Sequence, residues 1–194
     1  MITFPDTSTT LLVKLAARET GVDQAAWFRF FALYQPVMVE FARMKGAGDD
    51  AEDVVQEVFA DLAKAFQAGR YAREKGSFRA YLATMLRNEL ISRFRRKQAK
   101  SRVDGRARTP AAPLAAPSAD DLPVWNLARH RAAVEHVLTK TALSEQSRRI
   151  YRELLATGDS CAKVARRMGL PAATVRQVKS RVSRMIAAFE KAAK

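Results

Sequence analysis

Hydrophobic side chains recur every three or four residues along most of the chain, which is the spacing of one face of an α-helix. In the first half, three such stripes lie at residues 27–44, 54–66 and 78–94. Two glycines in segment 46–48 separate the first two stripes, and Asp49 or Asp50 is placed to cap the second helix. Pro36 predicts a kink in the first helix. Strand-like alternation of useful length is absent, so this half is predicted to be helical.

The second half repeats the helical pattern and ends in a characteristic arrangement. Its hydrophobic stripes lie at residues 134–138, 150–155, 164–168 and 175–189. Ser144 is placed to open the second of these helices, and Gly169 ends the third because glycine tolerates a left-handed backbone. Pro171 suits the first turn of the last helix. A short helix, a glycine turn and a longer basic helix predict a helix-turn-helix.

A proline-rich segment separates the two halves. Residues 101–123 contain four of the seven prolines among alanine and serine residues. Proline lacks an amide hydrogen and disfavours helix at the preceding residue, so this segment is predicted to be a flexible, extended linker. We therefore expect an all-α protein with two small helical domains, 1–100 and 124–194, joined by the linker 101–123.

Charge is distributed unevenly over these parts. The chain has 34 Lys and Arg residues against 20 Asp and Glu, a net charge of +14, which indicates a polyanionic partner and first of all nucleic acid. Residues 124–194 contain 15 bases and five acids. Residues 49–62, by contrast, contain six acids and no base, and we expect no internal cationic match for them. Because coating DNA does not require an acidic block, a basic protein is the expected partner of this surface.

The last helix has polar side chains that could contact duplex DNA. Those that lie away from its hydrophobic stripe are Thr174, Arg176, Gln177, Lys179, Ser180, Arg181 and Arg184. Arg and Gln can read base edges with paired hydrogen bonds, while Lys, Ser and Thr can bind phosphate. The alternative is a helical hairpin with a solvated basic face.

A second candidate surface combines aromatic and basic residues at 78–97. Aromatic rings can stack on unpaired bases while neighbouring cations hold the backbone. The helix is expected to expose Arg79, Thr84, Arg87 and Asn88, and the run 91–97 follows them. The alternative places Phe78, Tyr81 and Phe94 in the hydrophobic core.

Catalytic and metal-binding patterns are absent from the sequence. The single cysteine, Cys161, excludes an internal disulfide and a multi-cysteine metal site. His130 and His136 are remote from the acidic block, and no phosphate-binding glycine loop or nucleophile motif occurs. We therefore expect no enzyme activity, metal or cofactor. No apolar window is long enough to span a membrane and the first residues lack a signal-peptide pattern, so a cytoplasmic protein without membrane insertion is expected.

Two motifs in this order resemble a known family. DAEDVVQEVF at 50–59 and GSFRAYLATMLRN at 76–88 are similar to the second conserved region of bacterial sigma factors. The tail at 143–189 resembles the fourth region, and the compact layout resembles the extracytoplasmic-function (ECF) group of the sigma-70 family. The resemblance implies a protein that binds core RNA polymerase and directs it to promoter DNA. It also raises the question of an anti-sigma factor as a further partner.

The resemblance also implies a role for each surface. The acidic helix would dock on a basic coiled coil of the polymerase's largest subunit through Asp50, Asp53, Gln56 and Glu57. The next loop and helix would open and read the −10 promoter element through Arg73, Lys75, Ser77, Phe78, Arg79, Tyr81, Thr84, Arg87, Asn88, Ser92, Arg95 and Arg96. The seven polar residues of the last helix would read the −35 element.

Two other functions remain open at this point. A helix-turn-helix regulator that acts without core polymerase would not need the acidic block or the aromatic-basic segment. A metal-dependent nuclease could use the acidic carboxylates as ligands, and its activity would vanish with Asp53. Capture of core polymerase separates the three hypotheses.

Overall fold

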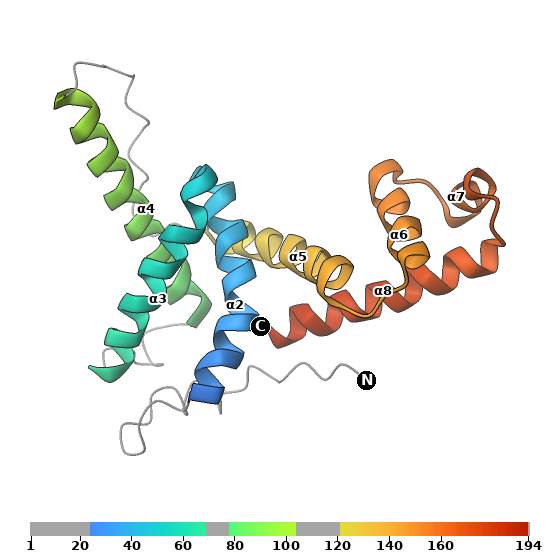
Figure 1. Cartoon of the computed structure of the whole chain (residues 1–194), viewed down its shortest axis with the longest axis horizontal. Helices are drawn as coiled ribbons and strands as arrows, with labels where there is room; N and C mark the ends of the chain where they lie inside the picture. Colours follow the sequence, from blue (N-terminus) through green and yellow to red (C-terminus); the bar gives the residue numbers. More distant parts are fainter. Residues whose placement is uncertain (1–23, 69–77, 104–120, 194) are drawn as a thin grey trace.

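The computed structural model describes residues 24–68, 78–103 and 121–193, and every regular element in these ranges is helical. In chain order the elements are α2 (Gln24–Met44), the 3-10 turn η1 (Gly48–Asp50), α3 (Ala51–Gln67), α4 (Phe78–Val103), α5 (Asp121–Lys140), α6 (Glu145–Thr157), α7 (Cys161–Met168) and α8 (Ala172–Ala192) (Figure 1). The all-α prediction is thus confirmed. None of the described helices is long and apolar enough to cross a membrane.

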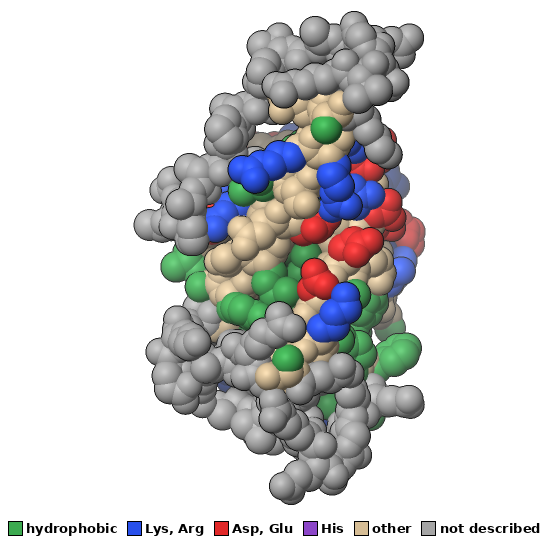
Figure 2. Space-filling view, turned by 90° about the vertical axis from the view of Figure 1, so that its left-hand side faces the viewer, with side chains coloured by type: hydrophobic (Ala, Val, Ile, Leu, Met, Phe, Trp, Pro, Cys, Tyr) green, Lys and Arg blue, Asp and Glu red, His purple; other side chains and the backbone are tan. Residues whose placement is uncertain are grey.

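The first three long helices bury the stripes that the sequence predicts. From α2 the largest fully buried side chains are Phe30, Tyr34, Val37, Met38 and Phe41, and α3 adds Val54, Val55 and Leu62. α2 is one continuous helix through Pro36. The outer surface of this half carries Asp and Glu side chains next to Lys and Arg side chains (Figure 2).

Two sequence expectations about helix ends are corrected. Asp50 does occupy the N-cap position of α3, but its side chain makes no capping hydrogen bond and pairs with Lys97 instead. α4 does not end near Phe94 and continues to Val103, since the Arg, Lys, Gln and Ala residues beyond Phe94 have high helix propensity. α4 and α5 each reach into the predicted linker 101–123, whose middle lies outside the described residues.

Local caps set the helix boundaries of the second half. The Ser147 amide donates to Ser144 Oγ over 3.3 Å, so Ser144 opens α6 as predicted. Gly169 ends α7 in the left-handed conformation at φ 64°, which is also as predicted. A helix of 21 residues, α8, follows Pro171. α6 and α7 pack against α8 nearer its N-terminal end (Figure 1).

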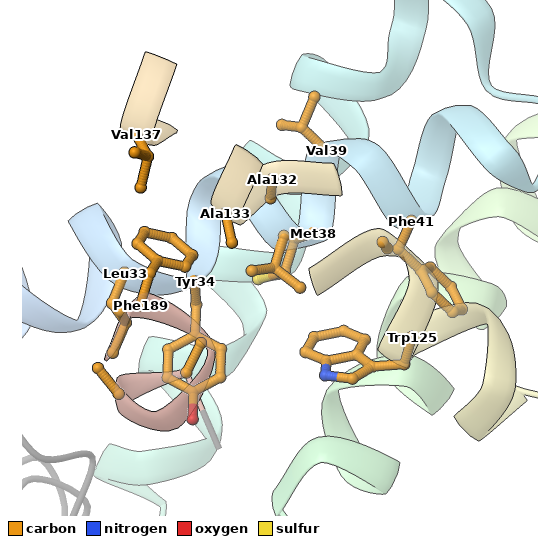
Figure 3. Packing of buried hydrophobic residues seen from close by; sticks show 14 of the residues in the cluster. Leu33, Tyr34, Met38, Val39, Phe41, Trp125, Ala132, Ala133, Val137 and Phe189 are labelled. Carbon is orange, nitrogen blue, oxygen red and sulfur yellow. The ribbon is translucent and has the colours of Figure 1, made fainter. Parts of the chain in front are cut away.

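The hydrophobic core extends across both halves of the chain. α5 packs along α2, and α8 packs against α5. In the close view, the Trp125 ring of α5 lies beside Phe41 of α2, with ring centroids 5.7 Å apart (Figure 3). Buried residues of all the described α-helices form one continuous cluster, although the domain boundaries at residues 100 and 124 remain a prediction.

Candidate protein and nucleic-acid interfaces

The first candidate surface, here called the acidic face, consists of Asp50, Asp53, Gln56 and Glu57. Helical periodicity creates the acidic face: the valines of α3 face the core, so the residues between them face solvent. Asp53, Gln56 and Glu57 are exposed, and Asp50 is half-buried at the start of the helix. The structure therefore places the four predicted polymerase-binding residues along one side of α3.

Two cations of α4 partly neutralise the acidic face, which corrects the expectation of no internal cationic match. Arg93 Nη2 of α4 lies 3.2 Å from Asp53 Oδ2, and the ammonium of Lys97 contacts Asp50. The hydrogen bond from Lys97 lowers the pKa of the Asp50 carboxyl below its ordinary value. These pairs form because α4 packs beside α3, a contact between distant segments that charge counting along the sequence does not detect.

The middle of α4 presents a second candidate surface, a hollow that opens to solvent. Its volume is about 470 Å³, and the described residues that line it are Asn88, Ile91, Ser92, Arg95 and Arg96. Four of these five are predicted −10 residues. Arg96 is held by Glu89 at 2.5 Å, whereas Arg95 is exposed and makes no ion pair with any described residue. The hollow thus combines amide, hydroxyl and guanidinium groups, which suit an unpaired nucleotide strand.

Two other predicted −10 residues are buried, and for Arg87 this corrects the expectation of an exposed side chain. Phe78 is 7% exposed and packs between Phe30 and Phe66, with ring centroids 5.6 and 6.2 Å away. Arg87 is 3% exposed because α5 packs over this part of α4, and its Nη1 donates to Asp121 Oδ2 over 2.7 Å. Phe78 therefore belongs to the core, the alternative that the sequence left open.

The remaining predicted −10 residues occupy intermediate positions or fall outside the described ranges. Arg79, Tyr81 and Thr84 are half-buried, and Tyr81 packs partly against the core. The Thr84 hydroxyl donates to the Ala80 carbonyl over 2.8 Å, so it is occupied within its own helix. The predicted residues of the preceding loop, Arg73, Lys75 and Ser77, lie outside the described residues.

The third candidate surface is the outer side of α8. Its hydrophobic stripe is turned inward as predicted, with Val175, Val182 and Phe189 buried. Of the predicted −35 residues, Thr174 is half-buried and the exposed ones are Arg176, Gln177, Lys179, Ser180, Arg181 and Arg184. No acidic group in the described parts of the chain pairs with the four cations of this set. This surface therefore offers free positive charge next to groups that can read base edges.

A compact ion-pair network joins α6 and α7, the two helices that pack against this end of α8. Arg167 of α7 contacts Glu153 of α6 and Asp159 of the connecting turn, both at 2.5 Å. The Arg167 hydrogen bond lowers the pKa of the Asp159 carboxyl, and the two carboxylates raise the pKa of the guanidinium. Sequence reasoning missed this residue because its two partners lie in different elements.

Metal chemistry finds no support in the described ranges. They contain no group of three or more His, Cys, Asp or Glu side chains arranged to hold a metal ion. Cys161 is half-buried at the start of α7 and packs against the core.

A comparison with family models identifies the segment that carries the first two surfaces. Residues 30–100 match the sigma-70 region 2 family. This segment is similar to a sigma-70 region 2. The match begins inside α2 and ends inside α4, so it contains both the acidic face and the hollow. It supports a sigma factor of the sigma-70 family, with binding to RNA polymerase and a role in transcription initiation.

The match covers somewhat more than a third of the chain and leaves the helix-turn-helix outside it. No curated protein and no solved structure matches the chain.

Proposed function

We propose that this protein is a sigma factor of the ECF group that binds core RNA polymerase and directs promoter-specific initiation. The region 2 match carries the proposal, because it falls on an exposed acidic face and on an adjoining helix with a polar hollow. Neither feature is needed by a regulator that binds duplex DNA alone. A sigma factor acts where the polymerase is, which places this protein in the cytoplasm.

Polymerase docking is assigned to the acidic face. Gln56 and Glu57 are exposed and have no ion-pair or hydrogen-bond partner among the described residues. Asp53 is 72% exposed in its side chain, so its pair with Arg93 is accessible to water. Exposed ion pairs of this kind contribute about 0–1 kcal/mol. A basic surface on the polymerase can therefore displace Arg93 at little cost.

Promoter contacts are divided between two surfaces. The hollow of α4, with Asn88, Ser92 and Arg95, would hold the unpaired −10 strand, and the outer side of α8 would read the −35 duplex. In this proposal 1–100 and 124–194 act as two domains joined by 101–123, so that each raises the effective concentration of the other on DNA. An anti-sigma factor that covers either surface would be a further partner.

Reversal of one charge on the acidic face tests the proposal. Asp53→Arg should abolish capture of core polymerase, because the new cation would face both Arg93 and the basic polymerase surface. Glu135→Arg is the matched control, since it makes the same charge change at an exposed site on α5. Capture should be measured by pull-down, with far-UV circular dichroism as the check on helix content.

The same experiment separates the competing functions. If the wild-type chain fails to capture core polymerase but binds duplex DNA, the protein is a regulator that acts alone. Normal capture by Asp53→Arg would show that docking uses another surface.

A further inference from the structure

Two cations from different segments of the first half, Lys45 and Arg87, converge on one carboxylate where α5 meets this half. Lys45 Nζ, just after α2, lies 2.8 Å from Asp121 Oδ1, and Arg87 Nη1 of α4 lies 2.7 Å from Asp121 Oδ2. The side chains of Lys45, Arg87 and Asp121 are 19%, 3% and 9% exposed. Each carboxylate oxygen of Asp121 thus pairs with one cation. Two oxygens of a phosphate group could pair with the same two cations in the same way.

This junction contains two buried donors without acceptors. Arg87 Nε and Trp125 Nε1 are both buried and make no hydrogen bond with any described residue. A buried donor without an acceptor is unfavourable, so these two groups reduce the stability that the packing of α5 provides. The guanidinium of Arg87 also has more donors than Asp121 satisfies.

The two cations lie close to the surface proposed to bind the unpaired strand. Arg87 is one helical turn before Ile91, and its neighbour in sequence is Asn88; both Asn88 and Ile91 line the hollow. With α5 in place, Asp121 occupies the two cations and α5 covers them. With α5 displaced, Lys45 and Arg87 would add two positive charges beside the hollow.

We propose that Lys45 and Arg87 form a binding site for a backbone phosphate of the nucleic acid, and that Asp121 occupies this site in the closed chain. α5 then acts as an internal competitor, and nucleic acid binds fully only after α5 leaves. The inference rests on the proposed function insofar as it extends the strand-binding surface of α4. It assigns a role to Lys45 and Asp121, which neither the sequence patterns nor the resemblance identified.

The test uses the full chain and a fluorescein-labelled single-stranded DNA of mixed sequence, because phosphate contacts are independent of sequence. Asp121→Asn keeps the shape of the side chain and removes its charge. Its affinity, measured by fluorescence anisotropy, should rise by roughly tenfold, since the competent form is no longer a minor state. Glu135→Gln makes the same charge change at an exposed position of α5 and should raise the affinity less than about twofold.

A second variant identifies the site that is released. Adding Lys45→Gln to Asp121→Asn should reverse most of the gain in affinity. It should also reduce the slope of log affinity against log salt concentration by about one, the value for one phosphate contact. A gain in Asp121→Asn no larger than that in Glu135→Gln would overturn the proposal. So would a gain that Lys45→Gln leaves intact.

Folding and the proposed function are controlled separately. If circular dichroism shows that Asp121→Asn does not fold, Glu40→Gln takes its place, because it loosens α5 by removing the 2.9 Å pair with Arg131. A smaller Lys45-dependent gain, up to about fivefold, is then expected because an exposed ion pair contributes only about 0–1 kcal/mol, and the absence of any such gain overturns the proposal. No polymerase is present in this assay, so failure of core polymerase capture would refute the sigma-factor function without deciding the phosphate site.

Discussion

Among single residues, the charged side chains differ most in how far their neighbours neutralise them. Asp50 and Asp53 each have a cation from α4, and Arg167 has two carboxylates. Arg176 and Lys179 on α8 have no such partner among the described residues. Because unpaired cations repel one another until a polyanion arrives, the positive charge of α8 is available for DNA, whereas part of that on α4 is already compensated.

His136 provides a prediction at this scale. It lies on α5 and packs against α8, with its ring centroid 4.8 Å from that of Phe189, and burial, aided by Lys140, lowers its pKa below the ordinary value of 6.5. The unfolded chain therefore binds the proton more readily, so this contribution to stability is complete above pH 6.5 and decreases as the pH falls through that value. The free energy of unfolding should decrease from about pH 7.5 to about pH 5.5. Its slope against pH should correspond to a difference of less than one bound proton between the folded and unfolded chains.

Variants of the two histidines check the assignment, with urea unfolding as the measurement. His136→Phe should remove the decrease, while His130→Gln, which removes the other histidine, should retain it. Asp50 and Asp159 do not interfere, because their pKa values are lowered from 3.8 and they titrate below this range. An unchanged slope in His136→Phe would assign the pH dependence to another group.

The candidate residues show which features of a site the sequence can predict. The exposure of Asp53 and Gln177 follows from helical periodicity, which is a local property. The burial of Arg87 does not, because its partner Asp121 is 34 positions away in the segment predicted to be a linker. Arg87 occupies a polar position in the pattern of α4, and only the packing of α5 covers it.

The helix boundaries also show which features the sequence can predict. The boundaries at Ser144 and Gly169 were predicted correctly because a cap hydrogen bond and a left-handed glycine depend on adjacent residues. The end of α4 was placed too early, since its hydrophobic stripe stops near Phe94 while the helix continues to Val103 without an apolar face. Hydrophobic periodicity detects the buried part of a helix and not a solvated extension.

The recognition helix α8 provides a prediction at this scale. Gln177 and Lys179 are both exposed on its outer side, but an amide can read a base edge and an ammonium binds phosphate. On a duplex selected from a random library, Gln177→Ala should cost roughly 1–3 kcal/mol of binding and relax the sequence preference. Lys179→Ala should weaken binding to all sequences alike and reduce the salt slope by about one.

Affinities of the full chain for the selected duplex and for a scrambled duplex measure both effects. Lys191→Ala is the control, because Lys191 is exposed at the opposite end of α8. If Gln177→Ala weakens both duplexes equally, this residue does not read bases, and the register of the recognition helix must be reassigned.

For the whole molecule, the position of α5 is what the sequence does not predict. Proline content predicts a linker over 101–123 but not where the next helix packs, and Trp125 of α5 is fully buried and lies against Phe41 of α2. Charged contacts reinforce this packing, because Arg131 pairs with Glu40 and Asp121 pairs with Lys45. Composition describes how a segment behaves by itself and carries no information on the surface against which the next helix packs.

The shared core leads to a prediction about cooperativity. Phe41→Ala should cost about 3–5 kcal/mol of stability, because it leaves a cavity beside Trp125. Since α5 packs against both α2 and α8, the loss of stability should extend to α7. A fluorescent label on the single cysteine, Cys161, reports the unfolding of α7. The unfolding midpoints reported by the label and by far-UV circular dichroism should decrease together.

Leu155→Ala is the control, because this side chain is 51% exposed and its removal should change the stability by only about 0.5 kcal/mol. A label midpoint that stays at its wild-type value in Phe41→Ala would show that the two halves unfold independently, and the closed contact of α5 would then be too weak to hold Asp121 on its two cations.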